Sequence, residues 1–147
     1  MATERFLVCT ACVSQEYAGP LFDALKAAVN DSVPLCKCGT KRYLKLIFPF
    51  AFSVTPHACR VVRAFLPDQP PSWPDGTGDT VTFYPFLVIC ESLDAEMRKT
   101  AWMPYWHGIT SSGNNKPKMK YGQWAPHMDS DILDDLVQQA RKVRLLI

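Results

Sequence analysis

Two pairs of closely spaced cysteines constrain the fold of this chain more than any other feature of its sequence. Cys9 and Cys12 stand at C-x-x-C spacing, and Cys36 and Cys38 stand at C-x-C spacing. Two thiolates separated by one or two residues can bind the same ion from one turn of backbone, and zinc takes four such ligands in a tetrahedron. The spacing therefore predicts one four-cysteine metal site near the N-terminus, with structural zinc as the expected ion.

At these cysteines the chain resembles the zinc-ribbon and zinc-knuckle class, in which two cysteine-bearing turns clamp a structural ion. The resemblance covers about residues 5–42 and implies a zinc-stapled N-terminal lobe over residues 1–42. The second pair departs from the commoner C-x-x-C spacing. A helix is also expected between the two pairs, because Gly19 and Pro20 precede a run of apolar residues at helical spacing.

Other interpretations of the cysteines stay open. Cysteine is frequent in protein cores as a small hydrophobic residue, which is how we interpret Cys59 and Cys90 in their apolar strand patterns. A strand, then Cys9 and Cys12, then a helix also resembles the start of a thioredoxin-like fold. The expected helix begins several residues after Cys12, so Cys9 would not lie at the helix N-terminus that lowers a thiol pKa. Four thiolates can also hold an iron–sulfur cluster.

The composition is that of a globular protein with little net charge. Of the 147 residues, 48% are hydrophobic and 20% are charged, and the net charge of +2 gives no overall electrostatic bias towards nucleic acid or an anionic membrane. No run approaches the roughly 18 apolar residues of a membrane-spanning helix, and the first residues lack the features of a secretory signal. We therefore expect a cytoplasmic protein without a membrane partner, in which reduced cysteines bind metal more readily than they form disulfides.

The remaining residues, 43–147, predict an α+β body that forms one compact domain with the lobe. Its expected core is a mainly antiparallel sheet packed by a C-terminal helix over residues 130–146, whose acidic residues come early and basic residues late, as the helix dipole favours. A shorter helix is expected over residues 92–103 and a loop over residues 67–80. Alternating apolar residues predict the strands at 5–9, 43–54, 59–66 and 81–91.

Aromatic and basic residues gather between Trp102 and His127, a region without clear periodicity. This composition is typical of a surface that stacks bases and neutralises phosphates, but also of a loop whose aromatic residues pack on the core. The absence of a recognition-helix motif favours single strands over duplex. The candidate contact residues are Trp102, Trp106, Lys116, Lys118, Lys120, Tyr121 and Trp124.

No catalytic motif accompanies these features. The chain lacks a phosphate-binding loop, a nucleophile elbow and paired histidines at metalloprotease spacing, and nothing indicates a small-molecule cofactor. We therefore expect binding more than catalysis: a zinc-stabilised module that acts on nucleic acid, with single strands favoured, or within a nucleoprotein assembly. The alternatives are a protein–protein adaptor subunit and a thiol oxidoreductase that uses Cys9 and Cys12.

Overall fold

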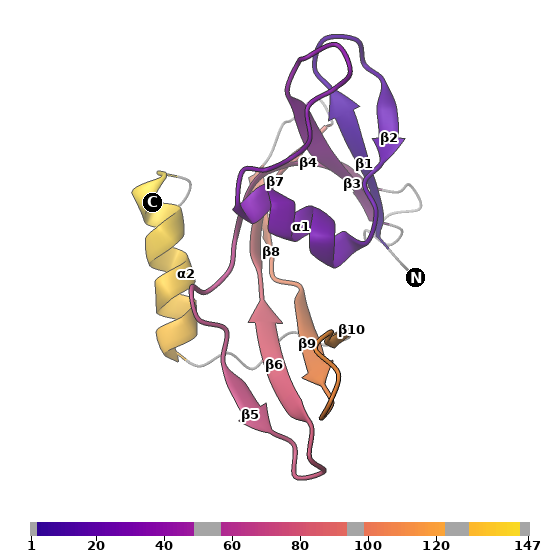
Figure 1. Cartoon of the computed structure of the whole chain (residues 1–147). Helices are drawn as coiled ribbons and strands as arrows, with labels where there is room; N and C mark the ends of the chain where they lie inside the picture. Colours follow the sequence, from indigo (N-terminus) through magenta and orange to yellow (C-terminus); the bar gives the residue numbers. More distant parts are fainter. Residues whose placement is uncertain (1–2, 49–56, 94–98, 123–129, 145–147) are drawn as a thin grey trace. The chain divides into compact units, whose positions relative to one another are not determined.

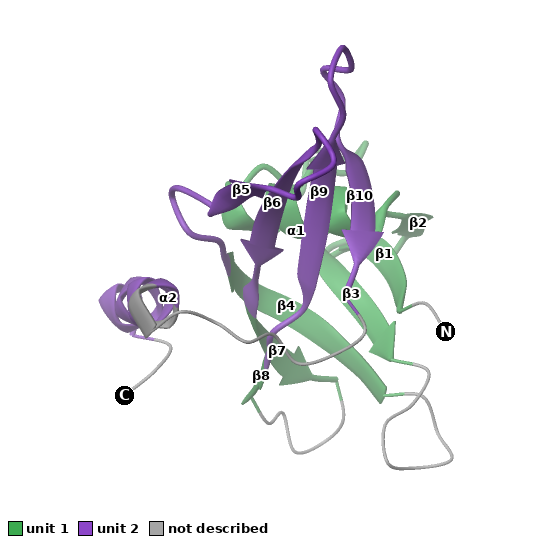
Figure 2. Ribbon diagram, turned by 90° about the horizontal axis from the view of Figure 1, so that it is seen from below, with its two compact units in different colours: residues 1–64, 88–101 green, residues 65–87, 102–147 purple. Residues whose placement is uncertain are grey.

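The chain forms two compact units, each with its own sheet (Figures 1 and 2). The computed structural model describes residues 3–48, 57–93, 99–122 and 130–144. The first unit combines residues 1–64 with 88–101, and the second combines residues 65–87 with 102–147. Mostly antiparallel sheets with two helices, one of them C-terminal, confirm the predicted α+β class. None of the described helices has the length and apolar character needed to cross a membrane.

The first unit contains a six-stranded sheet with the order β2-β1-β3-β4-β7-β8. Strand β1 pairs antiparallel with β2 and with β3, and β3 pairs antiparallel with β4. The core of this unit includes Leu25 on the helix and Leu44 and Leu46 on β3, all almost fully buried. Its elements are β1 Glu4–Cys9, β2 Gln15–Tyr17, α1 Leu21–Val29, β3 Arg42–Phe48, β4 His57–Phe65, β7 Leu87–Ser92 and β8 Lys99–Trp102.

The second unit contains a four-stranded antiparallel sheet with the order β10-β9-β6-β5. The C-terminal helix α2 buries Leu136 and Ala140, which are four residues apart and so lie on one side of the helix. Arg141 and Lys142 occupy its last turn, as the charge pattern predicts. The elements are β5 Ser72–Pro74, β6 Thr80–Pro85, β9 Tyr105–Thr110, β10 Lys118–Tyr121 and α2 Ser130–Lys142.

The strand predicted over residues 81–91 is two strands that belong to different sheets. Pro85 ends β6. The N–H of Phe86 still donates to the carbonyl of Pro104 at 2.9 Å, one residue beyond the paired Pro85 and Tyr105, but Pro104 has no N–H to donate in return. Proline has no N–H to continue a ladder, which explains a break at this point. Nearly every side chain from Phe83 to Cys90 is buried, so the apolar run gave no sign of two separate strands.

The helix predicted over residues 92–103 is wrong where the structure describes it. Lys99–Trp102 forms β8, the strand next to β7 at the edge of the six-stranded sheet, and residues 94–98 lie outside the described residues. The backbone hydrogen bonds between β8 and β7 stabilise the strand more than the weak helical spacing of the apolar residues stabilises a helix. Short strands also lie where the sequence predicted turns, loops or no regular structure: β2, β5, β9 and β10.

The other predicted elements are confirmed. The strands expected at 5–9, 43–54 and 59–66 are β1, β3 and β4, although residues 49–54 lie outside the described residues. Helix α1 begins directly after Pro20, whose carbonyl accepts a hydrogen bond from the N–H of Ala24 at 3.0 Å. Helix α2 begins at Ser130 as expected and ends at Lys142, four residues before the predicted end.

Candidate metal centre

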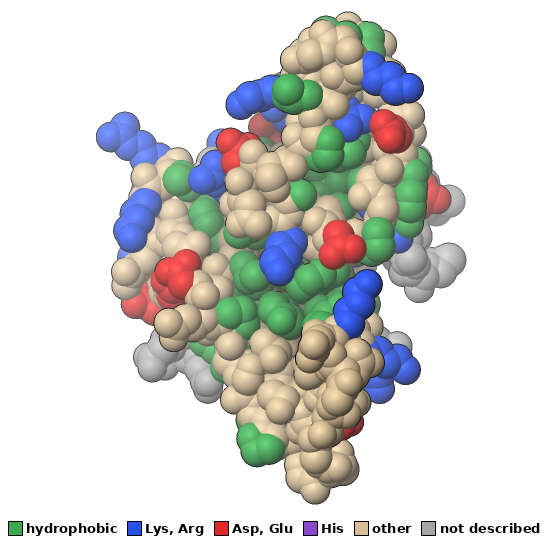
Figure 3. Space-filling view, in the orientation of Figure 1, with side chains coloured by type: hydrophobic (Ala, Val, Ile, Leu, Met, Phe, Trp, Pro, Cys, Tyr) green, Lys and Arg blue, Asp and Glu red, His purple; other side chains and the backbone are tan. Residues whose placement is uncertain are grey.

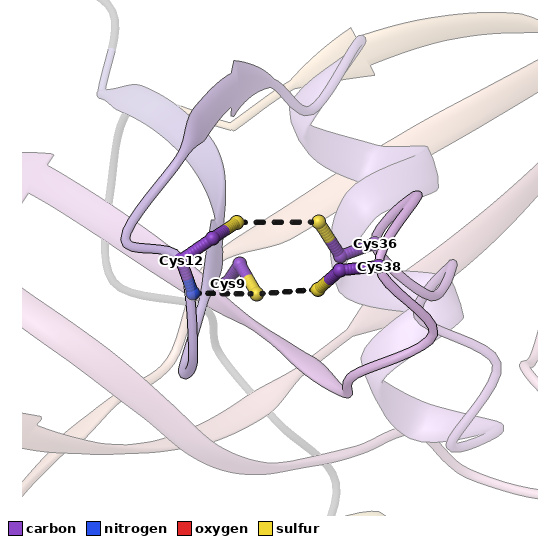
Figure 4. A group of neighbouring side chains, drawn as sticks. All are labelled: Cys9, Cys12, Cys36 and Cys38. Carbon is purple, nitrogen blue, oxygen red and sulfur yellow. Dashed lines mark hydrogen bonds between the residues drawn. The ribbon is translucent and has the colours of Figure 1, made fainter.

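The four cysteines predicted as metal ligands lie together in the first unit. All four Sγ atoms lie within 4.8 Å of one another. Figure 4 shows the two closest pairs, Cys9 with Cys38 and Cys12 with Cys36, each with a sulfur–sulfur distance of 3.6 Å. Four sulfurs at about 2.3 Å from a tetrahedral ion would be about 3.8 Å apart, whereas a disulfide bond is about 2 Å long. All four cysteines are free thiols, and their spacing is that of ligands around one metal ion.

The first cysteine pair is positioned by a tight loop between β1 and β2. Cys9 is the last residue of β1, and its N–H donates to the carbonyl of Ser14 at 3.0 Å, which closes the loop. Inside the loop, the backbone N–H groups of Ala11 and Cys12 both point at the Cys9 sulfur, at 3.4 Å. Donors aimed at a sulfur favour its thiolate form, which is the form that binds metal.

The second cysteine pair lies in the loop that leads into β3. The N–H of Cys36 donates to the carbonyl of Thr40 at 3.0 Å, and the N–H of Gly39 donates to the carbonyl of Cys36 at 2.8 Å. Gly39 has a φ of 81°, a left-handed conformation that glycine adopts without strain. Cys9 is opposite Arg42 in the β1–β3 pairing, so sheet register brings the two loops side by side.

Hydrogen bonds around the cluster change the pKa values of its thiols. The backbone N–H of Cys38 and the Ser14 hydroxyl lower the pKa of Cys36 to about 6. Ser14 lies 3.0 Å from the Cys12 sulfur and also lowers the pKa of Cys12. The pKa of Cys9 is raised, because the lowering effect of the Cys12 N–H is outweighed by burial and by neighbouring thiols. Cys36 and Cys12 therefore ionise more readily than Cys9.

The cluster lies at the surface rather than in the core. Cys9 is buried, Cys36 is half-buried, and Cys12 and Cys38 are exposed. Lys37 stands between the second pair and is exposed, and Figure 3 shows basic side chains on the surface of the first unit, at the top of the view. Four thiolates around a divalent ion carry a net negative charge, which nearby cations offset.

The structure separates the predicted contact residues into different surfaces. Lys116, Lys118 and Lys120 are exposed, and alternation places Lys118 and Lys120 on one face of β10. On the other face, Tyr121 is opposite Trp106, and their ring centroids are 5.1 Å apart. Trp106 is buried and contacts the ring of Phe86, so it is a core residue more than a contact residue. Trp102 ends β8, and Trp124 lies outside the described residues.

Sequence reasoning missed the aromatic residues that share a face with the lysines. Strand pairing places Trp73, Tyr105 and His107 on the same face of the four-stranded sheet as Lys118 and Lys120. Within β9, the alternation of residues 105, 107 and 109 was the only local indication that side chains of this strand share one face. Trp73 lies 45 residues before Lys118, so only the strand order of the sheet relates the two.

Comparisons with protein-family models, with curated proteins and with solved structures found no match to this chain. The resemblance to a zinc-binding knuckle is carried by the four cysteines and their geometry.

Proposed function

We propose that this protein is a zinc-stabilised binding module in which the four-cysteine site has a structural role. The observation that carries the proposal is the group of four sulfurs, contributed in pairs by two loops and spaced as a metal tetrahedron requires. A catalytic zinc ion keeps a position open for water or substrate, whereas four thiolates fill the coordination shell. The site needs reduced cysteines, which is consistent with the cytoplasm as its compartment.

Elemental analysis of the purified protein tests the zinc site. We expect about one zinc ion per chain in the unaltered protein and its loss in Cys12→Ser. Cys59→Ala removes a buried thiol outside the cluster and should keep the metal, so it controls for a general effect of losing a cysteine. Unaltered protein that is purified without zinc, or that holds another metal instead, would contradict the proposal.

A thiol oxidoreductase is the rival interpretation of the first cysteine pair. Strand β2 separates Cys12 from helix α1, which begins at Leu21, so the helix dipole does not act on either thiol of this pair. Alkylation of the zinc-loaded protein distinguishes the two functions. A structural site protects the four cysteines until a chelator is added, whereas an oxidoreductase would show rapid alkylation of Cys9 or Cys12 alone.

The partner that we propose for this module is nucleic acid, with single strands favoured. The supporting observation is the row of exposed lysines at Lys116, Lys118 and Lys120, which have no carboxylate partner among the residues that the structure describes. Lysines with no acidic partner can bind phosphates without first breaking an ion pair. A protein–protein adaptor would instead be recovered with a defined protein partner whose binding resists nuclease treatment.

Binding to a single-stranded oligonucleotide at several salt concentrations tests this partner. Replacing Lys116, Lys118 and Lys120 together by Ala should weaken binding and reduce the slope of log K against log salt by about 2, since each single-strand phosphate contact contributes about 0.7. The matched control removes three exposed positive charges at the C-terminal end of α2 and just after it, with Arg141, Lys142 and Arg144 changed to Ala. No binding by the unaltered protein at low salt would contradict the proposal.

A further inference from the structure

Strand pairing fixes which side chains share one face of the four-stranded sheet. Residues directly opposite one another in neighbouring strands point to the same side. Figure 2 shows β10, β9, β6 and β5 side by side. Two rows of side chains cross this sheet from β10: the first is Lys120, His107 and Phe83, and the second is Lys118, Ile109, Val81 and Trp73.

The rings on this face form one cluster. The centroid of the His107 ring lies 5.5 Å from those of Phe83 and Tyr105 and 6.3 Å from that of Trp73. Phe83 is buried beneath its neighbours, Tyr105 and His107 are half-buried, and Trp73 is 43% exposed. The interplanar angles of these contacts run from 34° to 82°, so the rings are not stacked in parallel on one another. Because Trp73 is exposed and Tyr105 and His107 are only half-buried, part of their ring surface remains accessible to a ligand.

Gly122 fixes the place of the Tyr105 ring on this face. Its N–H donates to the carbonyl of Tyr105 at 2.9 Å, which continues the β9–β10 pairing by one residue. A Cβ atom at position 122 would lie 1.9 Å from the Tyr105 ring. Because glycine has no Cβ, the ring can lie against the backbone of Gly122, diagonally next to Lys120.

The charges on this sheet are distributed unevenly. Lys118 and Lys120 lie on β10, at one edge, beside the ring cluster. Asp75 and Asp79 lie in the turn between β5 and β6, at the opposite edge. A polyanion is therefore attracted to the β10 edge and repelled by the β5–β6 turn. The rings of Tyr105 and His107 on β9 lie next to the basic edge, and Trp73 lies on β5 at the far edge.

From this arrangement we infer that Trp73, Tyr105 and His107, with Lys118 and Lys120 beside them, form a platform for unpaired nucleobases. We name these five residues the aromatic face. Its ligand is a single strand whose phosphates run along β10 and whose bases stack on the rings. Unpaired bases expose their π faces, whereas a duplex hides them, so the platform selects single strands without reading their sequence. The inference rests on the proposed nucleic-acid function and specifies its surface.

The experiment compares two fluorescent strands of equal length and charge, a thymidine dodecamer and an abasic dodecamer of sugar and phosphate alone. We expect the thymidine strand to bind at least tenfold more tightly, because only this strand has bases to stack. Trp73→Ala and His107→Ala should each weaken binding of the thymidine strand by about tenfold and leave the abasic strand unchanged. Trp73→Phe keeps a ring and should retain most of the affinity.

Tyr121→Ala is the matched control, because Tyr121 is an exposed aromatic residue on the opposite face of the same sheet. It should bind both strands like the unaltered protein, once thermal unfolding has shown that each variant is folded. Equal affinity for the two strands would overturn the aromatic face and leave the phosphate contacts of the proposed function intact. No binding of either strand at low salt would overturn the proposed function, and the aromatic face with it. A loss in Tyr121→Ala equal to that in Trp73→Ala would place the bases elsewhere and overturn the inference.

Discussion

Val13 adopts a backbone conformation that suits its side chain poorly. Its φ is 58°, in the left-handed region that β-branched residues rarely enter. It directly follows the first cysteine pair, just as Gly39, with a φ of 81°, follows the second. Both loops therefore turn in the same sense after their second cysteine, but only the second loop has the residue that does so without strain.

Replacing Val13 by Gly should stabilise the zinc-loaded protein. The left-handed conformation costs an L-residue roughly 1–2 kcal/mol, and the greater freedom of glycine in the unfolded chain offsets about half of this, leaving a gain of about 0.5–1 kcal/mol. Little packing is lost, because the Val13 side chain is 75% exposed. Thermal unfolding measures the change, and Gly39→Ala is the converse variant, which should lower the melting temperature. Destabilisation by Val13→Gly would show that the valine side chain makes contacts that outweigh its backbone strain.

Individual site residues differ in how far the sequence could reveal them. The cysteines of the metal centre were predictable, because ligands one or two residues apart are a local property of the chain. The contact of Ser14 with the Cys36 sulfur was not, since it depends on how two loops that are distant in sequence meet. The same limit applies to Trp73, which becomes a neighbour of His107 only through the pairing of β5 with β6 and of β6 with β9.

Among the secondary-structure elements, the β5–β6 hairpin depends on one side chain in its turn. The Asp75 carboxylate accepts hydrogen bonds from the Thr77 hydroxyl at 2.7 Å and from the Thr77 N–H at 2.8 Å. The turn is closed by the N–H of Asp75, which donates to the carbonyl of Asp79 at 3.1 Å. This turn leads directly into the pairing that places Trp73 opposite Val81, so it supports the position of the exposed ring.

The hairpin should therefore respond to acid through Asp75. The Thr77 hydroxyl and N–H lower the pKa of Asp75 in the folded protein. A carboxyl with a lowered folded pKa contributes stability that is full above its unfolded pKa of about 4 and is lost as the pH falls through the folded value. Asp75→Ala should lower the melting temperature at neutral pH, and its difference from the unaltered protein should shrink below about pH 4. Asp68→Ala controls for removal of an exposed carboxylate, and a difference that is constant with pH would contradict this role of Asp75.

Elements with long apolar patterns were predictable, and short edge strands were not. Strands β1, β3 and β4 and both helices follow from periodicity, because each carries enough apolar residues to show one buried side. Strands β2, β5, β8 and β10 have only three or four residues each, and their backbone hydrogen bonds depend on a partner strand. Local sequence therefore predicted turns at β2, a loop at β5 and a helix at β8, and it predicted no regular structure at β10.

At the scale of the whole molecule, the proposed functions belong to different units. The cysteine cluster lies within residues 1–64, and the aromatic face is built from residues of the second unit. Each unit has its own sheet and its own buried side chains, such as Leu46 in the first and Phe86 in the second. The local core of each unit can therefore persist when a stabilising contact in the other is lost.

Removal of the metal should accordingly loosen one unit and spare the other. With a chelator present, we expect faster hydrogen exchange for the N–H groups that close the two cysteine loops, those of Cys9 and Cys36, because the metal bonds that hold the two loops together are lost. The paired N–H groups of β9 and β10 should keep their protection, and the thymidine dodecamer should still bind. Cys59→Ala provides the matched comparison, since it leaves all four ligands in place. Equal loss of protection in both units would contradict this separation and make the metal a determinant of the entire fold.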